Sequence, residues 1–154
     1  MRAALQRSLA IALAMMLLGF PPRVAAEAPA PPAESTLRAA EWQAIKRVIG
    51  TQLAALKAGD DAKAFAHATP GIRQQFGTAK AFLAMVRTAY GALVAARYTE
   101  FLEGAVIEGN VIQPMRLVAP DNTVQVALYT MQRQPDGHWK IAGCVLAPST
   151  VQAA

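Results

Sequence analysis

The sequence predicts an α+β protein in which about three N-terminal helices pack on a curved, four-stranded antiparallel sheet. Two observations lead to this fold class. Apolar residues recur every three to four residues from about residue 36 to residue 93, and every second residue from about residue 97 onward. The later runs are separated by short turns, which join antiparallel neighbours. Helices followed by a run of strands are typical of an α+β domain.

The first helix is expected to begin after a cap at Ser35 or Thr36 and to end at Gly59. Its apolar stripe consists of Trp42, Ile45, Ile49, Leu53 and Leu56. Asp60 or Asp61 is expected to cap a short second helix. These two aspartates could instead form a carboxylate pair, but the cap is the better interpretation because Asp accepts backbone N–H groups at a helix start.

A brief helical turn is expected after Thr69-Pro70, and a further helix after a cap at Thr78. This last helix has the clearest helical pattern of the chain, formed by Phe82, Met85, Val86, Ala89, Tyr90 and Leu93. Such a stripe is more often core than cofactor site.

Four strands are expected over residues 98–108, 111–118, 123–133 and 139–147. Turn residues separate them, among them Asp121 and Asp136, where aspartate commonly bonds the backbone. Pro114 lies inside the second strand and predicts either an edge position or a bulge, because proline has no N–H to donate.

Residues 1–26 are expected to form a cleavable signal peptide. Arg2 and Arg7 precede an apolar run of twelve residues, and small residues end at Ala26, near which cleavage is expected. The run is shorter than the roughly 20 residues of a membrane span, so an uncleaved anchor is the less favoured alternative. The mature protein is therefore expected to be periplasmic or secreted, without a stable membrane anchor.

The remainder divides into a Pro/Ala-rich linker at residues 27–36, one folded domain at 37–148 and a tail at 149–154. Three of the 15 basic residues lie in the leader, which leaves 12 basic against 10 acidic side chains. This balance, without a basic cluster, argues against nucleic-acid binding. The only cysteine is Cys144, so no internal disulfide can form.

Four segments resemble an uncharacterised bacterial family, domain of unknown function 4864: QLAALKAGD (52–60), AFAHATPGIRQQFGT (64–78), AFLAMVRTAY (81–90) and ALYTMQRQPDGHWKIAGCVL (127–146). The order of elements also resembles the nuclear-transport-factor-2-like fold, a cone in which helices and a concave sheet often enclose an apolar pocket. The resemblance implies this fold and export behind a signal peptide. It implies no particular activity, since a fold does not settle function.

The residues expected to line such a pocket are Arg73, Phe76, Met85, Tyr90, Tyr129 and Trp139. Arg73 could hold a carboxylate or phosphate, or could instead bond helix-end carbonyls. Cys144 is expected to be a buried small hydrophobe; a reactive thiol and an intermolecular disulfide are its alternatives. The two histidines, His67 and His138, lack the spacing of a ligand set, so no metal is expected. No cofactor is expected either, because a chain that is exported unfolded should not carry one loaded in the cytoplasm.

The leading functional hypothesis is a non-catalytic exported module that binds a small apolar or amphipathic molecule, or a partner protein. One alternative is a small pocket enzyme of the isomerase or hydrolase type that uses Tyr90 or Tyr129 as proton donor. The sequence offers no evident carboxylate base for it. The other alternative is a structural homodimer joined through sheet faces.

Overall fold

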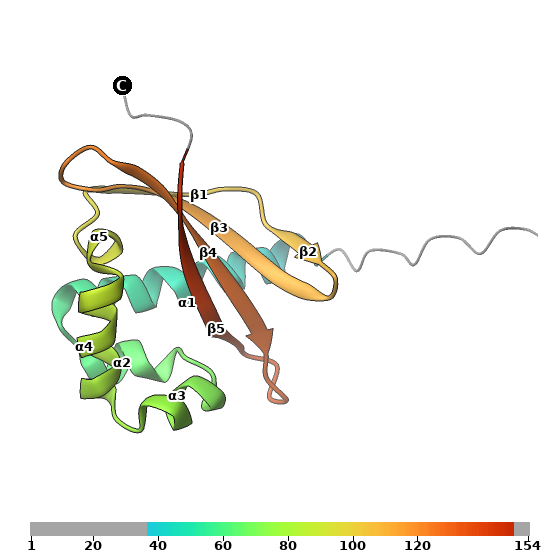
Figure 1. Ribbon diagram of the computed structural model, residues 1–154. Coiled ribbons are helices and arrows are strands. Elements are labelled where there is room, and N and C mark those ends of the chain that lie inside the picture. Colours follow the sequence, from blue (N-terminus) through green and yellow to red (C-terminus); the bar gives the residue numbers. More distant parts are fainter. Residues whose placement is uncertain (1–36, 150–154) are drawn as a thin grey trace, which may run out of the picture. The chain divides into compact units, whose positions relative to one another are not determined.

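The computed structural model describes residues 37–149; the expected leader, the linker up to residue 36 and the tail from residue 150 lie outside this range. The described region has helices first and strands afterwards, which confirms the α+β class (Figure 1). The elements are α1 (Ala39–Ala58), α2 (Asp61–Ala66), α3 (Pro70–Phe76), α4 (Ala79–Ala89), α5 (Gly91–Val94), β1 (Tyr98–Phe101), β2 (Ala105–Ile107), β3 (Asn110–Val118), β4 (Val124–Arg133) and β5 (Trp139–Pro148).

Side chains and backbone at the helix ends explain where the helices start and stop. The Asp60 carboxylate accepts the Lys63 N–H at 3.0 Å, and the Thr78 hydroxyl accepts the Ala81 N–H at 3.1 Å. Gly59 ends α1 with φ of 73°, a left-handed conformation that glycine adopts at little cost. These three predictions from the sequence are confirmed.

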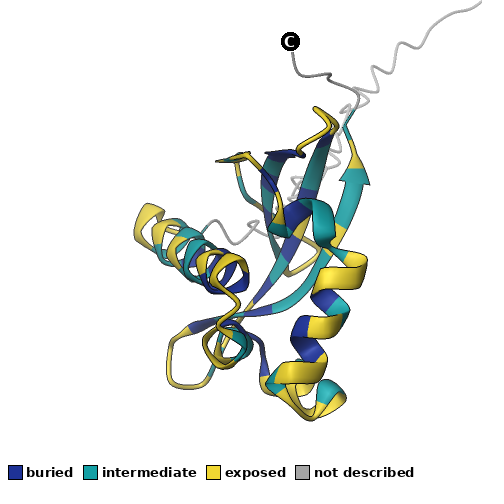
Figure 2. Ribbon diagram, turned by 90° about the vertical axis from the view of Figure 1, so that its left-hand side faces the viewer, coloured by how far each residue is buried: buried dark blue, intermediate teal, exposed yellow. Residues whose placement is uncertain are grey.

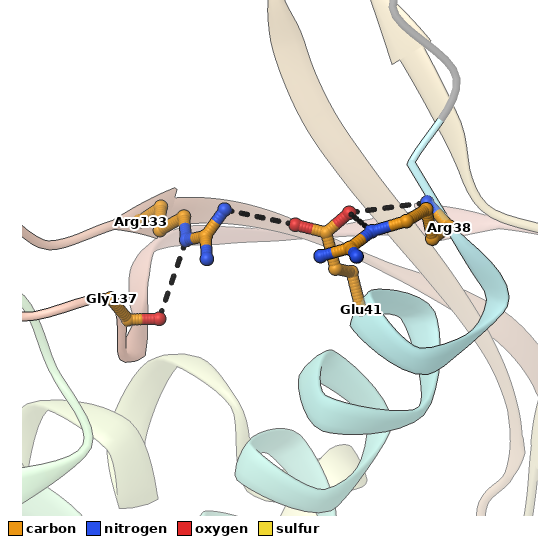
Figure 3. A network of polar contacts seen from close by, with 4 residues as sticks. All are labelled: Arg38, Glu41, Arg133 and Gly137. Atoms are coloured by element: carbon orange, nitrogen blue, oxygen red, sulfur yellow. Dashed lines mark hydrogen bonds and ion pairs between the residues drawn. The ribbon is translucent and has the colours of Figure 1, made fainter.

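The start of α1 differs from the prediction, because Arg38 rather than Ser35 or Thr36 precedes its first turn. Glu41 accepts the Arg38 backbone N–H at 3.2 Å, and Arg133 donates to Glu41 at 3.0 Å and to the Gly137 carbonyl at 3.4 Å (Figure 3). The backbone bond from Arg38 is the main cause that lowers the pKa of Glu41. This network joins the first turn of α1 to the turn between β4 and β5.

The last predicted helix is divided in two. α4 ends at Ala89, and Tyr90, with φ of −124° and ψ of 27°, separates it from the four-residue α5. The apolar stripe that reaches Leu93 therefore continues across a break in the helix, and this break orients the Tyr90 side chain toward β5.

The sheet has five strands rather than four, in the order β1-β3-β4-β5, and β2 also pairs with β3. All pairs are antiparallel. The predicted strand at residues 98–108 is interrupted at 102–104, opposite Pro114. In an antiparallel pair, the N–H and C=O of one residue point to the same neighbour. The Pro114 carbonyl accepts the Leu102 N–H at 3.0 Å, so the missing N–H of the proline faces this interruption.

Of the two predicted alternatives, the edge position is wrong, since β3 lies between β1 and β4. The sheet is irregular at Pro114, as a bulge would be, but on the partner strand, where residues 102–104 stand opposite residues 113–114. The break also brings Gly104 against α1. A Cβ at Gly104 would overlap the Trp42 ring, so only glycine permits this approach.

Two apolar clusters hold the domain together. In the first, α1 packs on the inner face of the sheet through Ile45, Ile49, Leu53, Met115, Leu117, Ala127, Tyr129, Met131, Trp139 and Ile141. In the second, the end of α1 packs with α2 and α4 through Ala55, Leu56, Ala64, Phe82, Leu83 and Val86. The buried residues gather where helices and sheet face one another (Figure 2). Tyr90 packs against both clusters, which places it at their junction.

Candidate functional site

A partly open cavity of about 290 Å³ lies at the junction of the two clusters. Elements far apart in the sequence form it: α1, α3, α4, α5, β4 and β5 all contribute. Its apolar wall consists of Leu56, Ala68, Ile72, Phe76, Phe82, Met85, Val86, Leu93, Ile141 and Ala142. The polar groups at its wall come from Gln52, Gln75, Tyr90, Tyr129 and Cys144.

The structure brings together four of the six pocket residues expected from the sequence. Phe76, Met85, Tyr90 and Tyr129 line the cavity, and Cys144 joins them. Phe76 and Met85 belong to the apolar wall, whereas the two tyrosines supply hydroxyl groups. The helical stripe of α4 therefore contributes both to the core and to the wall of the cavity.

Arg73 and Trp139 lie elsewhere. The Arg73 guanidinium lies 5.9 Å from the centre of the Phe65 ring, a cation–π distance, beside a separate and more open hollow. Trp139 is buried in the first cluster and borders a separate hollow beside α1, which His67 and His138 also line. Neither side chain contributes to the cavity.

Tyr129 occupies the inner face of β4 and is only 1 % exposed. In the sheet register it lies between Gln113 of β3 and Cys144 of β5. Its hydroxyl has no hydrogen-bond partner within residues 37–149. Burial is the main cause that raises the pKa of Tyr129 well above its usual range, so the hydroxyl keeps its proton.

Tyr90 joins the end of α4 to the sheet. Its hydroxyl donates to the Cys144 backbone carbonyl at 2.6 Å. Burial raises the pKa of Tyr90 as well, with a smaller contribution from Cys144. The proton of this hydroxyl is therefore already engaged within the protein.

Gln52 and Gln75 are polar residues of the cavity that the sequence did not predict there, and Gln52 is the buried one. Gln52 lies on α1, and its Nε2 donates to the Ala64 carbonyl of α2 at 3.1 Å. The signal was present: Gln52 follows Ile49 by three residues and precedes Leu56 by four, so a polar residue interrupts the apolar stripe.

Cys144 contributes a thiol to the cavity wall. Burial raises the pKa of this thiol to about 12. The thiolate is the nucleophilic form of cysteine, and it is scarce at neutral pH when the pKa is so high. At this position Cys144 acts as a small, weakly polar group.

The cavity wall carries no formal charge. Its residues include no lysine, arginine, histidine or carboxylate. The aspartates at 121 and 136, which the sequence placed in turns, accept the Thr123 and His138 backbone N–H groups, each at 2.9 Å. These bonds are the main cause that lowers the pKa of both aspartates, and they confirm the backbone role.

The described region offers neither a clustered ligand set nor a membrane-spanning helix. Residues 37–149 contain no group of three or more His, Cys, Asp or Glu side chains placed to hold a metal ion. No helix in this part of the chain is long and apolar enough to cross a membrane.

Comparison with known proteins places the chain in a family. Neither the curated proteins nor the solved structures gave a significant match. The family model described as "Domain of unknown function (DUF4864)" matches residues 38–154, which includes every element of the described fold. The chain therefore belongs to the DUF4864 family.

Proposed function

We propose that this domain is a non-catalytic module that binds a small, uncharged, apolar or amphipathic molecule in the cavity between the helices and the sheet. One observation carries the proposal: a cavity of about 290 Å³ has an apolar wall and presents a hydroxyl, that of Tyr129, with no partner among the described residues. Ligand sites are typically concave and apolar, with a few polar groups that fix orientation.

The size of the cavity suits a small molecule. An apolar cavity of roughly 150 Å³ in an engineered protein binds benzene, and natural ligand pockets begin at about 300 Å³. At about 290 Å³ the cavity lies between these cases, toward the larger. A monocyclic ring with a short substituent is a suitable occupant.

The chemistry of the wall favours binding over the alternative of a pocket enzyme. Acid–base catalysis needs a group poised to exchange protons near neutral pH. The pKa of Tyr129 is raised well above its usual range, and that of Cys144 is raised to about 12. The wall supplies no carboxylate or histidine to act as base.

Filling the cavity tests the proposal. Val86 is buried on α4 and lines the cavity, so Val86→Phe is expected to lower the affinity for isopropylbenzene at least tenfold by occupying its space. Val145→Phe is the matched control, because Val145 is 61 % exposed on β5 and does not line the cavity. Amide chemical shifts in NMR titrations of both variants and the wild type give the affinities.

Two outcomes of this titration would count against the proposal. One is a wild type that binds no isopropylbenzene at millimolar concentration, and the other is equal affinity in the two variants. In parallel, native mass spectrometry of freshly purified protein is expected to show additional mass that disappears on denaturation and that Val86→Phe has lost.

We further propose that the protein is bacterial and exported, and that its fold belongs to the nuclear-transport-factor-2-like superfamily. The basic residues and apolar run of residues 1–26 support export. Helices that cover one face of an open antiparallel sheet, with a cavity between, support the superfamily. Expression of the full chain in a bacterium is expected to yield periplasmic protein whose N-terminal sequence begins at Glu27. Intact Met1 on the recovered protein would contradict cleavage.

A further inference from the structure

The hydrogen-bond donors around the cavity are not equally available. Tyr90 donates to the Cys144 carbonyl at 2.6 Å, and Gln52 Nε2 donates to the Ala64 carbonyl at 3.1 Å. Tyr90 therefore ties two walls of the cavity together, and Gln52 ties the wall on α1 to α2. Gln75, the other amide at the wall, is exposed to solvent. The Tyr129 hydroxyl has no hydrogen-bond partner within the described residues, although the Tyr129 side chain is almost completely buried.

Tyr129 also lines the cavity, and its hydroxyl is not completely sealed. Two side-chain atoms of the described residues are both sealed from solvent and unpartnered, Gln113 Oε1 and Gln125 Oε1. The Tyr129 hydroxyl is not one of them, so a small part of it stays open, and the cavity is the space that Tyr129 lines. A buried donor without an acceptor is costly, and an acceptor atom on a bound molecule removes this cost.

The environment of the Tyr129 hydroxyl disfavours charged ligands. No cation lines the cavity to pair with a carboxylate or phosphate. The burial that raises the pKa of Tyr129 disfavours any anion at the same place and keeps the hydroxyl protonated as a donor. Transfer of an unpaired anion into such a site is far more costly than transfer of a neutral carbonyl group.

We infer that the cavity is selective for uncharged molecules that carry a carbonyl oxygen on an apolar body, such as a small ketone, ester or lactone, and that the Tyr129 hydroxyl donates to this oxygen. The inference rests on the proposed function, because it names the ligand class of the same cavity. In this inference, the Tyr129 hydroxyl selects the polar group of the ligand. The apolar wall from α3 and α4 selects the apolar body of the ligand.

Three probes of similar size test the inference: acetophenone carries the carbonyl, isopropylbenzene replaces it with apolar atoms, and benzoate replaces it with an anion. Tyr129→Phe is expected to lower the affinity for acetophenone about tenfold, the usual contribution of one buried hydrogen bond. The same variant should leave the affinity for isopropylbenzene unchanged or slightly higher. Benzoate should bind neither protein. Tyr98→Phe is the matched control, because Tyr98 is 54 % exposed on β1.

Infrared spectroscopy of bound acetophenone keeps the inference testable without a variant. A hydrogen bond from Tyr129 should lower the carbonyl stretching frequency in wild-type protein relative to acetophenone in an apolar solvent. An unshifted band would overturn the inference even if Tyr129→Phe did not fold.

The ways in which the inference can fail are distinguishable. If wild-type protein binds isopropylbenzene, but Tyr129→Phe changes the two neutral affinities equally, the proposed function stands and the role of Tyr129 is wrong. If benzoate binds as well as acetophenone, the selection for neutral ligands is wrong. If neither neutral probe binds, the proposed function fails, and the inference fails with it.

Discussion

Replacing Gln113 with glutamate is expected to lower the free energy of unfolding by about 3–5 kcal/mol at neutral pH. Gln113 is completely buried on β3, and its Nε2 donates to the Leu102 carbonyl at 2.8 Å and to the Pro114 carbonyl at 2.9 Å. A carboxylate at this position would face the two carbonyl oxygens with no proton to donate. An uncompensated buried charge is among the most destabilising changes that a single substitution can make.

The loss of unfolding free energy in Gln113→Glu should depend on pH. Burial of the introduced carboxyl group determines the direction of this dependence. Desolvation and the two carbonyls would raise the pKa of the introduced carboxyl group in the folded state above its unfolded value of about 4.3. The unfolded chain then binds fewer protons than the folded one as pH rises above about 4.3. Stability relative to wild type should therefore be highest at acidic pH and fall by up to about 1.4 kcal/mol per pH unit until the folded-state pKa is passed.

Urea unfolding of wild type and Gln113→Glu between about pH 4 and pH 8 measures this dependence. Gln132→Glu makes the same chemical change at an exposed position of β4 and should differ little from wild type across the range. A destabilisation of Gln113→Glu that stays constant with pH would show that the buried charge is not its cause.

Replacing Ile49 with alanine is the second substitution for which a large effect is expected, a loss of about 2–5 kcal/mol. Ile49 is completely buried in the first cluster, where α1 packs on the sheet. Removing its branched side chain forfeits burial of apolar surface and leaves a void that rigid neighbours on the strands cannot fill.

Ile107→Ala is the matched control for this substitution, because Ile107 is 57 % exposed on β2. Thermal and urea unfolding of both variants should show a loss several times larger for Ile49→Ala. Equal losses would mean that intrinsic propensity, rather than packing of α1 on the sheet, accounts for the effect.

The two large effects differ in how far the sequence anticipates them. Ile49 belongs to a helical stripe that is visible from spacing alone, so its burial is predictable. Gln113 alternates with Met115 and Leu117, so its inward direction is also visible from spacing. Spacing does not show what its amide bonds: Pro114 faces a break in the partner strand, and this break leaves the Leu102 carbonyl for the Gln113 amide to bond.

The residues of the candidate site also divide into those whose place the sequence predicts and those whose place it does not. Phe76, Met85, Tyr90 and Tyr129 were expected at a pocket because they are large side chains on faces directed toward the core. Arg73 was expected there from its place in a turn, but turn conformation does not fix the direction of a long side chain, and its guanidinium lies over Phe65 instead. Gln52 interrupts the apolar stripe of α1, but a polar residue in such a stripe does not by itself indicate a cavity.

The sequence by itself determined the α+β class, the order of helices and strands, the caps at Asp60 and Thr78, and the turns at Asp121 and Asp136. Each depends on periodicity or on hydrogen bonds between residues close together in the chain. Only the tertiary structure decided that β1 and β2 are separate, that Tyr90 bonds β5, and that Tyr129 faces a cavity without a partner among the described residues. These features depend on atoms brought together from distant segments, and no local pattern in the chain encodes such distances.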